Sequence, residues 1–344
     1  MTLTLAKRFP QADLCIGSHN RAAISDAMLE DLNVIDLHAN ADFVPWRIIK
    51  SLHAFSHQTG FLQNYDWVIY GGNYSVAAVH NHSVGRNIHY CHTIPRFCYD
   101  LREYYLSRCP FWQRPLLLAL IGYVKSRYVK AIDKMDLVIA NSENVRRRIR
   151  RYLGKDAIVI HPPCATDRFH WLGQHDYYLS TARLEPFKRV DSIVAAFRQM
   201  SDKRLVIASG GSEFARLKRL AANADNIHFT GWITEDQQYQ LVGNAIATIY
   251  VPIDEDFGMS PVESMAAGKP VIGVAEGGLL ESVINNETGL LISSQSLIPA
   301  LINAVQHLDA RRALEMRTAC ENRARLFSKD IFLEAMGQVL TETP

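Results

Sequence analysis

The sequence has no apolar run long enough to cross a membrane. Its most apolar stretch, Leu116 to Val124, is far shorter than the ~20 residues that a spanning helix needs. The six cysteines form no C-x-x-C pair and show no histidine spacing suited to zinc. No signal-peptide pattern follows Met1. These absences predict a cytoplasmic protein with free thiols and argue against a disulfide-stabilised secreted protein.

The chain also has almost no net charge, at +2, but the charge is unevenly distributed. Residues 96–155 carry a net +9, which leaves −7 for the rest of the chain. The same stretch contains two aromatic pairs, Tyr104-Tyr105 and Phe111-Trp112. We expect residues 96–155 to contact an anionic membrane surface peripherally, because cations and aromatic rings favour such a surface.

Two other interpretations of this basic stretch are open. Leu116 to Val124 could form a buried helix, with the arginines simply solvated. A nucleic-acid partner is not expected, because no recognisable nucleic-acid module surrounds the arginines.

Short apolar runs alternate with longer helical patterns along the chain, which predicts α/β structure with parallel sheets built from βαβ units. The expected strands are Trp67 to Tyr70, Ile88 to Tyr90, Leu137 to Ala140, Ile158 to Ile160, Tyr178 to Ser180, Leu205 to Ala208, Ile227 to Phe229, Ala247 to Tyr250 and Val271 to Val274. The length suits two domains of about 150 residues each. His161-Pro162-Pro163 breaks the pattern and predicts a boundary, with domains at 1–163 and 164–326.

The segment from Asp254 to Ile272 has the most specific pattern. We expect a helix with Ser260 as its N-cap, Pro261 as its first residue and Gly268 just past its end. Its unpaired N–H groups would form an anion site, and Phe257-Gly258 and Met259 would let a ligand approach the backbone. Glu255 before the helix and Glu263 in its first turn could bind hydroxyls. A phosphate between two such carboxylates suggests a sugar nucleotide.

The same residues have simpler interpretations. Ser260 and Glu263 fit a capping box, in which the glutamate only accepts a backbone hydrogen bond. Asp254 and Asp256 fit a D-x-D metal clamp, although no further oxygen ligands are evident nearby, so no metal is expected.

The segment from Glu255 to Ile272 resembles the signature of a known family. A Glu, seven residues, a second Glu, a small-residue helix and G-x-P-V-I are typical of the retaining glycosyltransferases of the fourth sequence family, glycosyl transferases group 1. The resemblance implies the GT-B fold, with two facing Rossmann-like domains and a cleft between them. It also implies that Glu255 contacts the transferred sugar and Glu263 holds the ribose of a nucleotide-sugar donor.

Further segments carry the resemblance through the second domain. Thr181 to Asp191 looks like the family segment whose Arg and Lys grip the donor diphosphate, here Arg183 and Lys188. Two fixed cations would stabilise the charge that develops on a departing nucleoside diphosphate. Gly210-Gly211 and Asn226 to Trp232 resemble the family's glycine turn and the strand whose following loop lies by the base, so Gly210, Gly211 and Trp232 are predicted to contact the donor.

In the first domain, Ile88 to Arg96 resembles the H-T-P segment of a mannosyltransferase-like branch. This implies that His92 lies near the reacting sugar, where it could donate to a hydroxyl or act as a cation, and that Arg96 contacts acceptor or phosphate. A purely structural role for His92 is the alternative. One departure is that Thr2 to Pro10 looks like the helix that follows the family's first strand and glycine loop, so that strand is expected to be missing.

The resemblance predicts transfer of a hexose, mannose from GDP-mannose, to a growing lipid-linked surface polysaccharide or oligosaccharide, with no metal or other cofactor. A UDP-sugar-dependent glucosyl- or galactosyltransferase is an alternative donor assignment. A catalytically weak, donor-binding scaffold of a glycan-assembly complex and a GT-B epimerase are the competing functions. The last helix, 327–344, is expected to cross back to the first domain.

Overall fold

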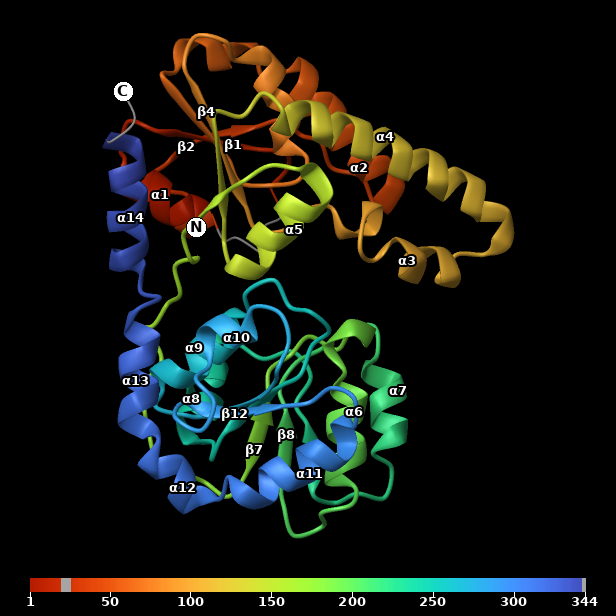
Figure 1. Cartoon of the computed structure of the whole chain (residues 1–344), viewed down its shortest axis with the longest axis vertical. Helices are drawn as coiled ribbons and strands as arrows, with labels where there is room; N and C mark the ends of the chain where they lie inside the picture. The colour runs from red at the N-terminus through yellow and green to blue at the C-terminus, as the bar shows by residue number, and fades with distance from the viewer. Residues whose placement is uncertain (20–25, 342–344) are drawn as a thin grey trace. The chain divides into compact units, whose positions relative to one another are not determined.

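The computed structural model describes residues 1–19 and 26–341 (Figure 1). The chain divides into two compact units, Met1–His161 and Pro162–Pro344, and each has its own apolar core. Both units are built on parallel strands, which confirms the predicted α/β class.

The first unit begins with a helix and contains two separate parallel sheets. The smaller sheet pairs β1 (Asp13–Ile16) with β2 (Asn33–Asp36). The larger has the order β3 (Trp67–Tyr70), β4 (Arg86–Cys91), β5 (Leu137–Ala140) and β6 (Ile158–Val159). The α-helices are α1 (Thr2–Arg8), α2 (Val44–His57), α3 (Arg102–Arg108), α4 (Arg114–Ile132) and α5 (Glu143–Leu153). Short 3-10 turns are η1 (Asp26–Met28), η2 (Gly60–Asn64), η3 (Ser75–Asn81), η4 (Arg96–Cys98) and η5 (Phe111–Gln113).

Helix α5 shows how local sequence sets these elements. The hydroxyl of Ser142 accepts a hydrogen bond from the N–H of Val145 at 3.0 Å and so caps the first turn. Gly154 ends the helix in the left-handed conformation, at φ 65°. Arg150 and Arg151 lie in the last turn, where cations are favoured by the helix dipole.

The second unit has one six-stranded parallel sheet in the order β12-β11-β10-β7-β8-β9. Its strands are β7 (Tyr178–Ser180), β8 (Leu205–Ile207), β9 (Ile227–Phe229), β10 (Thr248–Tyr250), β11 (Val271–Val274) and β12 (Gly289–Ile292). Strands β7, β10 and β11 are buried along their whole length, as expected where helices cover both faces of a parallel sheet. The strand order reverses between β10 and β7, and ligands of such sheets bind beyond the carboxyl ends of the strands at that point.

The helices of the second unit form two groups, one around α6 and one around α9 (Figure 1). They are α6 (Val190–Phe197), α7 (Phe214–Leu220), α8 (Glu235–Asn244), α9 (Met259–Ala266), α10 (Leu279–Ser282), α11 (Leu297–His307), α12 (Ala310–Glu315), α13 (Arg317–Arg325) and α14 (Lys329–Thr341), with the 3-10 turn η6 (Pro186–Lys188). None of the helices within the described ranges is long and apolar enough to cross a membrane.

All nine predicted strands are present, with small differences at some ends. The sequence analysis did not predict β1, β2 or β12. Strands β1 and β2 contain charged or polar residues at their ends, whereas β12 contains the apolar run Leu290 to Ile292. The predicted helix at Thr2 to Pro10 is α1, and the predicted last helix is α14, although residues 342–344 lie outside the described part of the chain. Its crossing to the first domain stays a prediction.

Candidate functional site

Two loops of the second unit lie at the strand-order reversal. One follows β7 and contains Arg183 and Lys188, and the other follows β10 and leads through Glu255 into α9. They are far apart in sequence but start at the carboxyl ends of neighbouring parallel strands, so both lie at the same sheet edge.

An ion pair joins the two loops. The Lys188 ammonium lies 2.7 Å from the Glu255 carboxylate and donates to the Tyr250 hydroxyl at 2.9 Å. Both charged side chains are mostly buried, with 15% of Lys188 and 18% of Glu255 exposed, which strengthens the interaction between them. Burial raises the pKa of Tyr250 well above its usual value, with the nearby Glu255 adding to the effect, so its hydroxyl stays protonated. The sequence did not predict Tyr250, whose signal is its position as the last residue of β10.

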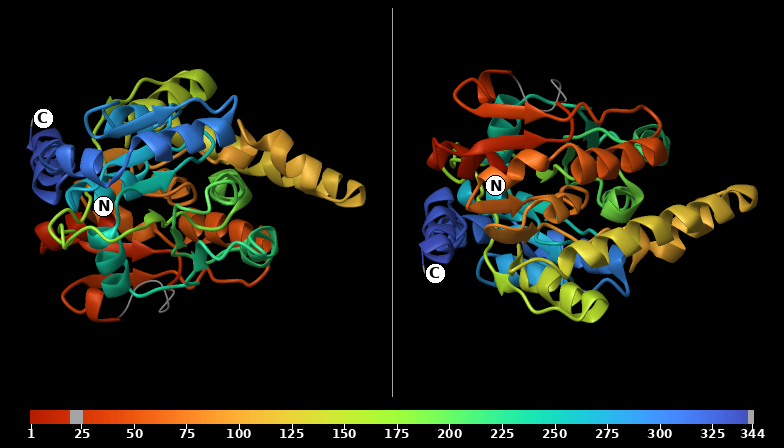
Figure 2. Two further views of the ribbon diagram at one scale, coloured as in Figure 1. Left: turned by 90° about the horizontal axis from the view of Figure 1, so that it is seen from below. Right: turned by 90° about the horizontal axis from the view of Figure 1, so that it is seen from above.

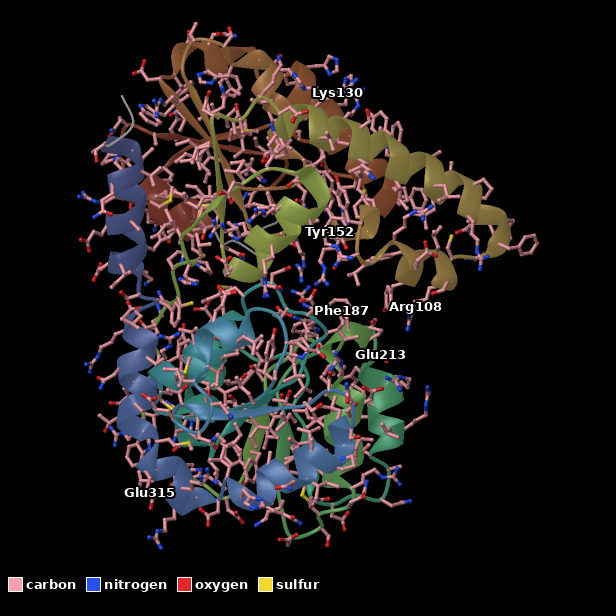
Figure 3. The ribbon with its side chains drawn as sticks, viewed as in Figure 1. Arg108, Lys130, Tyr152, Phe187, Glu213 and Glu315 are labelled. Atoms are coloured by element: carbon pink, nitrogen blue, oxygen red, sulfur yellow. The ribbon has the colours of Figure 1, made fainter. Side chains whose placement is uncertain are left out.

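The predicted diphosphate contact Arg183 is exposed, and no carboxylate among the described residues is recorded as its ion-pair partner. Its neighbour Leu184 donates its N–H to the carbonyl of Gly210 at 3.0 Å, and the N–H of Glu213 donates to the Leu184 carbonyl at 2.9 Å. These bonds hold the Arg183 segment beside the predicted glycine turn. Phe187, on the same loop, is labelled in Figure 3 near Glu213.

Trp232 lies against the glycine turn. A Cβ added to Gly210 would meet the indole ring at 2.5 Å, so the close approach depends on a residue without a side chain. The ring is otherwise 72% exposed. The structure therefore brings the segment of Arg183 together with Gly210, Gly211 and Trp232, and leaves a broad aromatic face open to solvent. Their contact with a donor stays a prediction.

The start of α9 differs from the prediction. The N-cap is Gly258 and the helix begins at Met259, so the prediction of Ser260 as the cap is wrong. The cap has φ 84°, a conformation that favours glycine. Pro261 is then the third helical residue, where its missing N–H removes no helical bond. The N–H groups of Met259 and Ser260 remain as donors at the positive end of the helix.

This shift also moves Glu263. It lies in the second turn of α9 rather than the first, so the capping-box interpretation is wrong. Its carboxylate accepts a hydrogen bond from the Gln238 amide at 3.3 Å. Glu263 keeps some accessible surface, yet burial of its carboxyl raises the pKa to about 7. A buried acid with one neutral hydrogen-bond donor is suited to accept further hydroxyl donors.

Phe257 was predicted to let a ligand approach its backbone, and its side chain belongs to the core. Its ring is 2% exposed and packs edge-on against Phe327, with centroids 5.3 Å apart. Only the backbone of Phe257 can therefore approach a ligand, whereas the side chain of Met259 is exposed.

Glu276 is a further site residue that the sequence did not predict. Its carboxylate lies 2.8 Å from the Arg189 guanidinium and accepts the N–H of Asp254 at 3.4 Å. Arg189 and Asp254 both have positive φ, at 51° and 42°, which is strained for residues with side chains. Glu276 thus contacts both strained loops, the one that contains Lys188 and the one that contains Glu255.

His92 follows β4 in the first unit. Its ring packs against Tyr90, with centroids 5.0 Å apart, and burial lowers its pKa to about 4. His92 is therefore neutral near pH 7, which fits hydrogen bonding to a hydroxyl better than the cationic role. Arg96 is held by Asp100 at 2.6 Å, with both side chains mostly buried.

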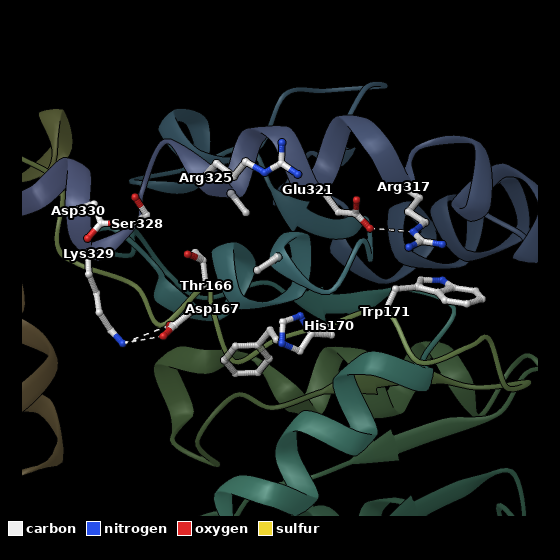
Figure 4. A pocket seen from close by; sticks show the side chains of 13 residues that line it. Thr166, Asp167, His170, Trp171, Arg317, Glu321, Arg325, Ser328, Lys329 and Asp330 are labelled. Carbon is white, nitrogen blue, oxygen red and sulfur yellow. Dashed lines mark hydrogen bonds and ion pairs between the residues drawn. The ribbon is translucent and has the colours of Figure 1, made fainter.

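A cavity of the second unit lies elsewhere. It has a volume of about 500 Å³ and is lined by residues that include Trp171, Arg317 and Lys329 (Figure 4). Two ion pairs lie in its lining, Arg317 with Glu321 and Lys329 with Asp167. None of the predicted donor-binding residues lines this cavity. Among the described residues, no three histidine, cysteine, aspartate or glutamate side chains cluster as a metal site would require.

The sequence of residues 168–327 matches the family model described as Glycosyl transferases group 1. This range contains both loops, the Lys188–Glu255 pair and the start of α9. Residues 168–327 therefore resemble the glycosyl transferases group 1 family. The group 1 segment thus coincides with the unit that carries the charged site.

Curated relatives match only part of the chain. The chain is 30% identical, over 220 residues, to the GDP-mannose-dependent alpha-(1-6)-phosphatidylinositol monomannoside mannosyltransferase of Mycobacterium tuberculosis, covering 54% of this chain and 56% of the relative. A 59-residue stretch is 49% identical to the alpha-1,3/1,6-mannosyltransferase ALG2 of Dictyostelium discoideum, covering 17% and 14%. The chain therefore spans about half, or less, of these curated relatives.

Solved structures resemble the chain over nearly its full length. The Anabaena protein HepE, solved with UDP and glucose, gives a TM-score of 0.74 at 15% identity, covering 98% of this chain and 94% of that one. A glycosyltransferase of Rickettsia africae gives 0.73 at 18% identity, covering 99% and 93%. At these identities the likeness shows the fold, and the predicted GT-B class with two Rossmann-like units is confirmed.

Proposed function

We propose that this chain is a retaining glycosyltransferase that moves mannose from GDP-mannose to a growing lipid-linked surface polysaccharide or oligosaccharide. The group 1 segment and the GT-B fold support hexosyl transfer. The mycobacterial and Dictyostelium relatives, both named as mannosyltransferases, support mannose as the sugar. Peripheral contact with the cytoplasmic face of a membrane through residues 96–155 would bring the enzyme to a lipid-linked acceptor.

The Lys188–Glu255 pair at the strand-order reversal carries this proposal. A donor diphosphate would attract Lys188, which lies in reach of the loop before α9. Exposed Arg183 and the N–H groups at the start of α9 would add positive potential on the same sheet edge. These groups stabilise the charge that grows on the leaving diphosphate as the glycosidic bond breaks.

In the proposed reaction, the bond between the sugar's anomeric carbon and the diphosphate oxygen breaks, and a bond to the acceptor oxygen forms on the same face. The acceptor proton passes to the departing phosphate oxygen, so neither a separate base nor a metal is needed. Glu255 positions the sugar, Glu263 accepts the ribose hydroxyls, and neutral His92 donates to a sugar hydroxyl. Trp232 and the Gly210-Gly211 turn would contact the base.

A donor-binding scaffold is the second candidate. The division of the first unit's strands into two separate sheets, β1–β2 and β3–β6, favours it, because an interrupted sheet positions its loops less firmly. Such a scaffold would bind the donor without transferring the sugar.

Turnover of purified protein with a donor panel tests the proposal. GDP-mannose, UDP-glucose, UDP-galactose and UDP-N-acetylglucosamine are assayed for nucleoside diphosphate release, with membrane extract as acceptor and with or without EDTA. We expect EDTA-resistant GDP release and an α-linked product, lost in Lys188→Ala and kept in Lys218→Ala, a matched change at an exposed lysine of the same unit. Release of UDP instead of GDP would reassign the donor. A β-linked product would refute the retaining mechanism, and donor binding without nucleoside diphosphate release would favour the scaffold.

A further inference from the structure

One segment of the first unit presents large apolar side chains to solvent. Helix α3 has no buried residue, and the first buried residue of α4 is Ile121. Between them, Phe111 is 80% exposed, Trp112 67% and Leu116 70%. We call residues 102–127 the arm and these three residues its tip. Both views of Figure 2 show α4 extending away from the strands of its own unit.

This exposure corrects one interpretation of the sequence. The apolar run from Leu116 to Val124 is a helix, but only its second half is buried, since Leu116 and Leu118 are exposed whereas Ile121 and Val124 are not. In the first half of the run, Leu117 packs against the core of the unit, whereas Leu116 and Leu118 are exposed. Packing in the core therefore does not explain why positions 116 and 118 carry leucine.

The arm is also strongly cationic. It contains five basic residues and one acid, Glu103, which pairs with its neighbour Arg102 at 2.9 Å. The basic residues are Arg102, Arg108, Arg114, Lys125 and Arg127. Arg108, labelled in Figure 3, lies over the Tyr104 ring at 4.1 Å, and Arg127 lies over Tyr123 at 4.5 Å. These contacts hold the charges along the arm without neutralising them.

We propose that the tip inserts into the headgroup region of an anionic lipid bilayer while the cations of the arm contact lipid phosphates. The inference rests on the membrane contact in the proposed function and narrows it from residues 96–155 to three inserting side chains. Trp and Phe are favoured at the boundary between headgroups and acyl chains, and each basic residue near an anionic surface adds attraction.

Lipid fits the arm better than a second copy of the chain does. A stable protein interface buries about 800 Å² on each partner. Two aromatic rings and one leucine supply less than this, since an aromatic side chain buries about 150–250 Å². Insertion into lipid has no such minimum area, because the bilayer adapts its shape to a small apolar tip and many lipid charges surround it.

Flotation of the full chain with vesicles tests the inference. We expect binding to phosphatidylcholine vesicles that contain phosphatidylglycerol, weakened by salt, and little binding to phosphatidylcholine alone. Phe111→Ser/Trp112→Ser should reduce the partition coefficient about tenfold or more, because two large apolar groups no longer leave water. Arg108→Glu/Arg114→Glu should reduce it similarly, and only on anionic vesicles.

The matched control is Phe43→Ser/Trp46→Ser, which removes an exposed aromatic pair from α2 and its N-cap in the same unit. The control should float as wild type does. Brominated lipid should quench Trp112 fluorescence, and Trp112→Phe should keep binding but lose that quenching.

Absence of wild-type flotation, equal flotation of the tip variant, or equal loss in the control would each overturn the inference. So would a dimer in solution that the tip variant dissociates. GDP-mannose binding in vesicle-free buffer reports separately on the proposed function, because the tip variant keeps every residue assigned to the donor. Lipid binding without donor binding would therefore reject the function and leave the inference standing.

Discussion

The Glu255 carboxylate and the diphosphate of a donor would compete for the Lys188 ammonium. Without a donor the two opposite charges satisfy each other, with Tyr250 as a further partner of the lysine. A diphosphate offers Lys188 more negative charge than one carboxylate does. Binding would then free Glu255 to accept hydroxyls of the transferred sugar, so one pair would prepare both contacts.

Lys188→Ala should reduce GDP release about 100-fold or more, as loss of one group that stabilises transition-state charge commonly does. It should also destabilise the fold by about 1–3 kcal/mol, because the mostly buried Glu255 carboxylate loses the cation beside it. Urea unfolding of Lys188→Ala, Glu255→Gln and the double variant checks this. The double variant should lose less stability than the two single losses together, and additive losses would show that the pair does not matter.

Glu263 predicts a pH dependence of stability. Its pKa is about 7 in the folded protein against 4.5 for an ordinary glutamate, so the folded state holds the extra proton between these values. Stability should therefore fall as pH rises from about 4.5 to 7, by at most about 3 kcal/mol. Glu263→Gln should remove this fall and be the more stable protein at pH 8. Identical pH profiles for the two proteins would contradict the assignment.

At the scale of elements, the two loops depend on backbone conformations with positive φ, which are strained for residues that have a side chain. Gly258 begins α9 with a positive φ, and the loop before it includes Asp254, which also has one. Strained conformations persist only where surrounding contacts determine them, and Glu276 supplies such contacts to Asp254 and Arg189.

Gly258→Ala should destabilise the protein by about 1–2 kcal/mol, because an L-residue in the left-handed region is strained. Space is not the cause, since an added Cβ would meet its nearest atom, on Leu279, at 3.4 Å. Thermal unfolding compared with Gly337→Ala, a helix-interior glycine with nothing within 4 Å of an added Cβ, measures the effect. The control should be neutral or stabilising, and an equally neutral Gly258→Ala would refute the strain.

Glu276→Gln should loosen both loops, because the Arg189 contact loses its charge. We expect a stability loss of about 1 kcal/mol and several-fold weaker donor binding. Glu334→Gln, at an exposed position of α14, is the matched control and should change neither quantity. Unchanged donor affinity in Glu276→Gln would mean that the loops keep their conformation without this contact.

The sequence predicted some of these elements better than others, for physical reasons. Buried strands such as β11 are continuous apolar runs, so their positions follow from local sequence. The predicted N-cap of α9 was wrong by two residues because glycine and serine are both favourable N-caps. The choice between Gly258 and Ser260 depends on the backbone φ angle, which the sequence does not show. Tyr250 and Glu276 were missed because their roles come from contacts with residues distant in sequence.

At the scale of the whole molecule, the proposed donor site and the arm proposed to bind lipid belong to different units. The donor-site residues other than His92 lie in Pro162–Pro344, and the arm lies in Met1–His161. The family signature predicted the donor-site residues from sequence alone, and the family model matches the segment that contains those of the second unit. The basic stretch at 96–155 predicted contact with an anionic membrane surface. Only the exposure of the side chains identifies Phe111, Trp112 and Leu116 as the tip of the arm.

Calorimetric titration of GDP-mannose into the purified full chain tests the central claim most directly. The account predicts saturable binding without added metal, weakened about tenfold or more in Lys188→Ala and unchanged in Lys218→Ala. It also predicts that wild-type affinity rises as pH passes through about 7, while that of Glu263→Gln does not. Absence of binding by any nucleotide sugar, or binding that Lys188→Ala leaves intact, would contradict the site.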